Sequence, residues 1–138
     1  MPGIAGSCLC GAVDYVVNGP LREIVYCHCT MCRRATGHYV AATACAVSDL
    51  VISHPEQVRW HRSSAEAERG FCGTCGSNLF WRPVSGTHVS ILAGSLDAPT
   101  GLRAAAHIFV GDKGDYYGLD DGLPQHRDGA HGVSPPRA

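Results

Sequence analysis

The sequence predicts a mainly β domain with little helix. Seventeen glycines and eight prolines divide the 138-residue chain into short apolar segments. These segments are rich in β-branched and aromatic residues and are bounded by Gly, Pro, Asn, Asp or Ser, which is typical of strands joined by turns. Apolar residues almost never recur with the spacing of an amphipathic helix. A chain of this length is expected to form one domain.

Eight segments are expected to be strands because they combine these residue types between turn residues. In chain order they are residues 12–17, 24–27, 39–47, 50–53, 58–62, 77–82, 88–93 and 105–110. Trp60 and Trp81 lie within two of these segments, and we expect both indole rings in the core. The one expected helical turn follows Cys29, includes residues 31–34 and ends at Gly37.

The folded domain is expected to cover residues 1–125. The chain becomes rich in Gly and Asp after Asp112, and residues 122–138 contain three prolines and no convincing strand. We therefore expect residues 126–138 to form a flexible tail. His126 and His131 lie in this tail, where exposure to solvent is favoured over a role at a metal.

Charge and hydropathy argue against nucleic acid and membrane as partners. The chain has 11 Lys and Arg against 12 Asp and Glu, so no basic excess is present to neutralise phosphates. No apolar run approaches the length of a membrane span, and the N-terminus lacks the apolar core of a secretory signal. We expect a soluble cytoplasmic protein, and nothing in the sequence indicates its oligomeric state.

Seven of the eight cysteines fall into three tight clusters, which is the strongest functional signal in the sequence. A disulfide framework belongs to small secreted chains, so a cytoplasmic setting favours metal thiolates. Two other interpretations stay open, although each explains less. Cys29 and Cys32 could form a redox pair, and cysteines can also hold an iron–sulfur cluster, although the spacings match no ferredoxin pattern.

Seven cysteines divide naturally into four and three. Cys8, Cys10, Cys72 and Cys75 lie in two pairs, each beside a glycine that permits the backbone to wrap an ion. Four thiolates complete a tetrahedral zinc site and leave no open position, so we assign this group a structural role.

Cys27, Cys29 and Cys32 are the remaining three, and three ligands plus an open position are typical of a catalytic zinc. His28 is expected to point away from them. Arg33, beside Cys32, is expected to help keep the thiolates ionised and to contact an anionic substrate, as is its neighbour Arg34. Alternative fourth ligands, for each of which a structural role is favoured, are Cys45, His54, His61, His88 and His107.

Three motifs carry a resemblance to a known family: Gly6-Ser7-Cys8-Leu9-Cys10-Gly11-Ala12-Val13, Cys27-His28-Cys29-Thr30-Met31-Cys32-Arg33 and Phe71-Cys72-Gly73-Thr74-Cys75-Gly76-Ser77-Asn78-Leu79. They resemble the glutathione-dependent formaldehyde-activating enzymes, a family that includes centromere protein V. Shorter matches follow at residues 93–97 and 107–110, so the resemblance runs from about Gly6 to Gln125.

The resemblance implies a β-tent-like fold of small antiparallel sheets with two Zn²⁺ per chain. The first and third motifs would share the structural zinc, and the middle motif would hold the catalytic zinc. The implied reaction joins glutathione and formaldehyde into S-hydroxymethylglutathione, and its reverse is that of a carbon–sulfur lyase. We therefore expect a zinc-dependent lyase-like enzyme acting on a small thiol such as glutathione and a small aldehyde. The alternative is a non-catalytic zinc-binding module that docks a protein partner.

Overall fold

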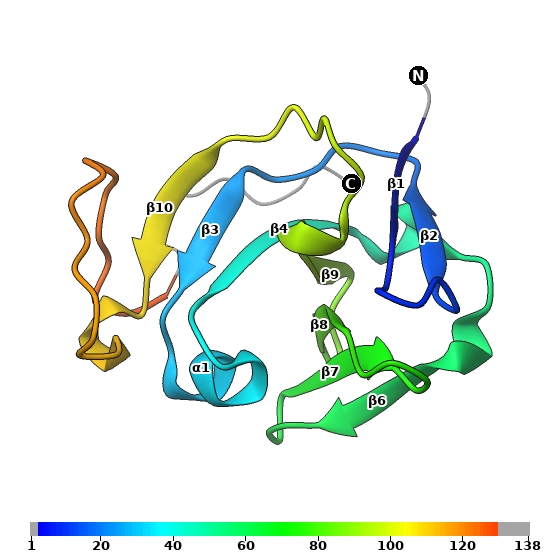
Figure 1. Ribbon diagram of the computed structural model, residues 1–138, viewed down its shortest axis with the longest axis horizontal. Helices are drawn as coiled ribbons and strands as arrows, with labels where there is room; N and C mark the ends of the chain where they lie inside the picture. Colours follow the sequence, from blue (N-terminus) through cyan, green and yellow to red (C-terminus); the bar gives the residue numbers. More distant parts are fainter. Residues whose placement is uncertain (1–2, 130–138) are drawn as a thin grey trace.

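The computed structural model describes residues 3–129, which form two β-sheets and one α-helix (Figure 1). The smaller sheet has the strand order β1-β2-β5 and the larger one β10-β3-β4-β9-β8-β7-β6. The strands are β1 (Ile4–Ser7), β2 (Asp14–Val17), β3 (Ile24–Cys27), β4 (Val40–Ala46), β5 (Leu50–Ile52), β6 (Val58–Arg62), β7 (Ala67–Cys72), β8 (Asn78–Pro83), β9 (His88–Leu92) and β10 (Ala104–Ile108). The helix is α1 (Thr30–Thr36).

The prediction of a mainly β fold with little helix is confirmed. Each of the eight expected segments overlaps a strand, whereas β1 and β7 were not expected. Every strand pair is antiparallel except β10 with β3, which is parallel. The expected helical turn is α1, and it ends where Gly37 adopts a left-handed conformation with φ of 90°.

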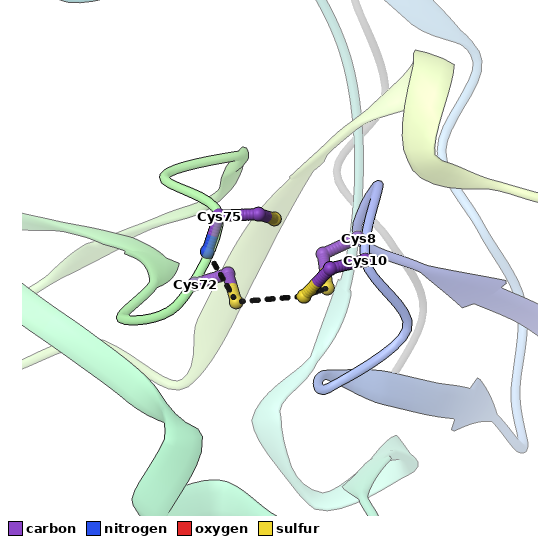
Figure 2. Close-up of side chains that lie close together, drawn as sticks. All are labelled: Cys8, Cys10, Cys72 and Cys75. Atoms are coloured by element: carbon purple, nitrogen blue, oxygen red, sulfur yellow. Dashed lines mark hydrogen bonds between the residues drawn. The ribbon is translucent and has the colours of Figure 1, made fainter.

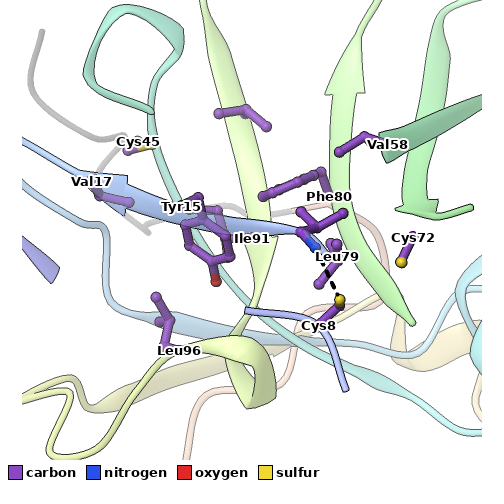
Figure 3. Close-up of a cluster of buried hydrophobic side chains, with 12 residues drawn as sticks. Cys8, Tyr15, Val17, Cys45, Val58, Cys72, Leu79, Phe80, Ile91 and Leu96 are labelled. Carbon is purple, nitrogen blue, oxygen red and sulfur yellow. Dashed lines mark hydrogen bonds between the residues drawn. The ribbon is translucent and has the colours of Figure 1, made fainter. Parts of the chain in front are cut away.

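The main core lies between the smaller sheet and the β8–β9 part of the larger sheet. Tyr15 of β2 packs edge-on against Phe80 of β8 with ring centroids 5.3 Å apart, and Ile91 of β9 is fully buried beside them (Figure 3). Cys45 is also fully buried in this core, which confirms its expected role as a small apolar side chain.

The two tryptophans occupy different faces of the larger sheet. Trp60 is half-buried and stacks on Phe80 at the edge of the core, with ring centroids 6.0 Å apart. Trp81 is also half-buried, but it follows Phe80 on the same strand and therefore faces the other side, where its ring lies 6.2 Å from His88. The expectation of a core position fits Trp60 better than Trp81.

After β10, the chain returns and runs beside the end of that strand. The amide of His107 donates to Pro124 (2.9 Å), and the amide of His126 donates to His107 (2.8 Å). The amide of Phe109 donates to the carbonyl of Asp128 (2.7 Å), so the first residues of the expected tail are bonded to the domain. Residues 130–138, including His131, lie outside the described residues.

Between residues 3 and 129, no helix is long and apolar enough to cross a membrane; α1 has only 7 residues.

Candidate metal centres

The four cysteines expected at a structural site come together from two distant turns. Cys8 and Cys10 lie in the loop after β1, whereas Cys72 ends β7 and Cys75 lies in the turn before β8 (Figure 2). All four sulfurs lie within 4.8 Å of one another. The Sγ atoms of Cys8 and Cys10 are 3.7 Å apart, and those of Cys10 and Cys72 are 3.8 Å apart. Zinc–sulfur bonds of about 2.3 Å place tetrahedral ligands ~3.8 Å apart, so this group fits zinc.

Backbone amides in both turns point at these sulfurs. The amide of Val13 donates to Cys8 Sγ (3.3 Å), and the amide of Cys75 donates to Cys72 Sγ (3.4 Å). Gly11 and Gly76, with φ of 84° and 80°, supply the left-handed residues that these tight turns require. Amide donors of this kind stabilise thiolates, the form that binds a metal.

Ser77 links the two turns. Its hydroxyl oxygen accepts a hydrogen bond from the amide of Leu9 (3.0 Å) and lies 3.1 Å from Cys75 Sγ. The bond to Ser77 is the main reason that the pKa of Cys75 is lowered to about 5. The sequence motif contains this serine, but nothing in its spacing indicated that it bridges the two turns.

The other three cysteines gather where β3 meets α1. Cys27 ends β3, Cys29 caps the N-terminus of α1, and Cys32 lies in the first turn of that helix. Their sulfurs lie within 4.8 Å of one another, with Cys32 Sγ 3.4 Å from Cys27 Sγ. Among the described residues, no fourth Cys, His, Asp or Glu joins this group. The alternative ligands that the sequence left open therefore lie elsewhere: Cys45, His54, His61, His88 and His107.

This arrangement favours a thiolate at Cys29. Hydrogen bonding from Cys27, and then from Cys32, lowers the pKa of Cys29 to about 2, with a further contribution from the amide of Cys32, which lies 3.2 Å from Cys29 Sγ. The same interaction with Cys29 raises the pKa of Cys27. The negative charge thus lies on Cys29, and three cysteine sulfurs form the soft donor set that suits zinc.

The cation that contacts this group is Arg69, which the sequence did not indicate. Nη2 of Arg69, on β7, lies 3.7 Å from Cys32 Sγ and donates to it. Arg33, which was expected beside the sulfurs, directs Nε toward the backbone carbonyl of Asp112 (3.4 Å). Arg34 is exposed. No local pattern could have revealed Arg69, because it lies 37 residues after Cys32 in the chain.

His28 points away from the sulfurs, as expected, and is fully buried in a hydrogen-bonded chain. Its Nδ1 lies 2.6 Å from the hydroxyl of Tyr117, and its Nε2 lies 2.9 Å from Nδ1 of His107. Nε2 of His107 lies 2.8 Å from the carboxylate of Asp121. Because a carboxylate only accepts, Nε2 of His107 donates to Asp121. When His107 is neutral, its Nδ1 accepts from Nε2 of His28, and Nδ1 of His28 then accepts from the hydroxyl of Tyr117.

Burial is the main cause that lowers the pKa of His28 to about 4, and the neighbouring His107 contributes further. His28 is therefore neutral, and both of its ring nitrogens are already bonded to protein groups. The histidine fixes the peptide between Cys27 and Cys29 rather than serving as a ligand.

A cavity of about 540 Å³ lies between the loop after β1 and the end of α1. Its walls include Leu9, Thr36, Tyr39, Asn78 and Ser95. Cys8 of the four-cysteine group also borders it, but the three-cysteine group does not. This cavity is therefore separate from the candidate reactive centre.

Comparison with known proteins found similar sequences and a similar fold. A family model described as glutathione-dependent formaldehyde-activating enzyme matches residues 3–112. A protein of Schizosaccharomyces pombe named as an uncharacterized lyase is 30% identical over 120 residues, which cover 85% of each chain. A crystal structure of a Rhodobacter sphaeroides protein superimposes with a TM-score of 0.57 at 24% identity. It covers 72% of this chain and 97% of the other, and it supports the fold.

Proposed function

The chain belongs to the glutathione-dependent formaldehyde-activating enzyme family, and from this we propose that it is a zinc-dependent carbon–sulfur lyase. It forms or cleaves an adduct between a small thiol, such as glutathione, and a small aldehyde, such as formaldehyde. The family match and the lyase name of the yeast relative support an enzyme of the lyase type. The observation that carries the proposal is the three-cysteine group, which has three thiol donors and no fourth protein ligand among the described residues.

The reaction needs no oxidant or reductant. The sulfur of the thiol forms a bond to the aldehyde carbon, and the electron pair of the carbonyl moves to its oxygen. That oxygen takes up one proton, which balances the proton that the thiol lost. The product is a hemithioacetal, and its cleavage is the reverse of these steps. Cys27, Cys29 and Cys32 would hold a zinc ion, which would supply a Lewis acid and stabilise the substrate thiol as its thiolate, the nucleophilic form.

The protein groups prepare this centre in three ways. The amide of Cys32 holds the sulfur of Cys29 at the helix terminus, and the lowered pKa of Cys29 keeps a thiolate ready for the metal. Arg69 places a positive charge beside the sulfurs. His28 anchors the peptide between two of the ligands, so it is a positioning residue. The sequence-based role of Arg33 as a substrate contact stays a prediction.

The four-cysteine group has a structural role in this proposal. Its four cysteines would complete a tetrahedral zinc site, which would connect the loop of the smaller sheet to the turn of the larger one. Metal binding to ligands from separate segments contributes directly to folding free energy. We expect two Zn²⁺ per chain and a cytoplasmic location, where thiols stay reduced.

The substitution Cys29→Ser tests the proposal, combined with metal analysis. We expect zinc to fall from about two per chain to one and turnover of glutathione and formaldehyde to be lost. Cys45→Ala is the matched control, because this cysteine is buried outside both groups, and it should keep both metals and the activity. Activity in Cys29→Ser with one bound zinc would contradict the mechanism. Two zincs in the unaltered protein that respond to no small thiol would instead favour the non-catalytic docking module.

A further inference from the structure

Arg69 reaches the three-cysteine group from a different part of the larger sheet. It lies on β7, between His61 of β6 and Trp81 of β8 in the strand register. Figure 1 shows the turn that joins β6 to the start of β7 next to α1, the helix that carries Cys32. Nη2 of Arg69 is 3.7 Å from Cys32 Sγ, so its guanidinium is directly beside the candidate reactive centre.

The charge of Arg69 is not balanced by a protein carboxylate. On the neighbouring strand, Arg82 pairs with Glu68 at 2.7 Å and lies over the ring of Trp60, 3.5 Å from its centroid. Between residues 3 and 129, no Asp or Glu lies within ion-pair distance of Arg69, and its recorded hydrogen bond goes to the sulfur. Arg69 is also only half-buried, so part of its side chain faces solvent.

A guanidinium carries five N–H donors in a planar fork that matches the two oxygens of a carboxylate. One donor of Arg69 is directed at Cys32 Sγ, and no described group engages the others. We propose that Arg69 binds a carboxylate of the thiol substrate and thereby selects thiols that carry a carboxylate a few bonds from the sulfur. This inference rests on the proposed function, because it assumes that a substrate sulfur joins the three-cysteine centre.

The proposal differs from the expectation for Arg33, whose Nε is directed at a backbone carbonyl. It also predicts a charge preference rather than a general gain in binding. A neutral thiol of the same length has no group for the guanidinium fork, so the loss of Arg69 should affect it little.

The test compares two ligands of equal length, 3-mercaptopropionate and 3-mercaptopropionamide, by calorimetric titration of the zinc-loaded protein. The unaltered protein should bind the acid more tightly than the amide. Arg69→Met should weaken binding of the acid by about 10- to 100-fold, the range for losing a hydrogen bond between charged groups, and binding of the amide by less than about 3-fold. Arg62→Met, on the adjacent strand and exposed, is the matched control and should change neither value.

Arg69→Lys keeps the charge but lacks the fork, so it should retain part of the preference for the acid. If Arg69→Met loses its zinc, the role of Arg69 is decided by the Arg69→Lys variant and by the preference of the unaltered protein for the acid. Equal binding of acid and amide by the unaltered protein, or equal weakening of both by loss of Arg69, would overturn the role of Arg69 and leave the proposed function standing. Binding of neither thiol, nor of glutathione, would overturn both.

Discussion

The hydroxyl of Tyr15, on the smaller sheet, forms a buried hydrogen bond with Ser95, and its removal should have opposite effects on stability at neutral and alkaline pH. The side chain is 1% exposed, and its hydroxyl lies 2.6 Å from Oγ of Ser95. Burial is the main cause that raises the pKa of Tyr15 to about 12. The substitution Tyr15→Phe keeps the ring on Phe80 and removes only the oxygen.

Near pH 8 the variant should lose one buried hydrogen bond, about 1 kcal/mol. Ser95 Oγ keeps its bond to the carbonyl of Leu92 (2.8 Å), so it is not left without a partner. In alkali the unfolded state releases the tyrosine proton at a pKa of about 10, whereas the folded state retains it to about 12. The unaltered protein therefore loses about 1.4 kcal/mol by pH 11 and roughly 2.7 kcal/mol at the limit above pH 12. The order of stability should reverse near pH 11.

Urea unfolding of the metal-loaded proteins at pH 8, 10 and 11 measures this reversal. Other titrating groups are the same in both proteins, so the difference between their unfolding free energies isolates Tyr15. Ser95→Ala is the matched control: it also removes the hydrogen bond, but it should keep the full alkaline loss because Tyr15 is still present. A difference between Tyr15→Phe and the unaltered protein that stays constant from pH 8 to pH 11 would refute the reasoning.

Three further substitutions test other contacts. Cys72→Ser should lower the zinc content by one and reduce the thermal midpoint, because this ligand joins the two sheets; two retained zincs would contradict its role. Asp121→Asn removes the carboxylate that accepts from His107 at 2.8 Å, so the unfolding free energy should fall by about 1–2 kcal/mol and amides of residues 113–121 should exchange faster; unchanged exchange would count against the hydrogen-bonded chain. Gly6→Ala places a methyl group 2.3 Å from the Tyr15 hydroxyl and should cost about 1–3 kcal/mol, and thermal unfolding at the unaltered midpoint would refute that contact.

The sequence was informative wherever a strand carries its own pattern. β9 begins with alternating polar and apolar residues, and β2 is rich in aromatic and β-branched residues. Each was predicted within a few residues of its observed ends. β1 was missed because its four residues include a small glycine, which the structure requires for close contact with Tyr15. β7 was missed because it contains charged residues and Gly70, which lies against the ring of Trp60. Pairing with β6 and β8, rather than local propensity, makes β7 a strand.

The cysteine groups were predictable because ligand spacing and number are properties of the sequence. The division into four and three matches the two groups whose sulfurs the fold brings together. The partners around them were not predictable, because Arg69 and the chain from Tyr117 to Asp121 depend on contacts between distant elements. His107 was expected to have a structural role, and the structure shows it bonded to His28 and Asp121.

The two ligand pairs of the four-cysteine group lie far apart in the sequence, so the group can form only late in synthesis of the chain. Cys10 emerges from the ribosome 62 residues before Cys72, its neighbour in the finished protein. Until that second pair emerges, the hairpin of β1 and β2 lacks the clamp that fastens it to the rest of the molecule. Nascent chains that end before Cys72 should therefore remain easily digested by protease at their N-terminal strands, and resistance should arise in one step once β8 has been made.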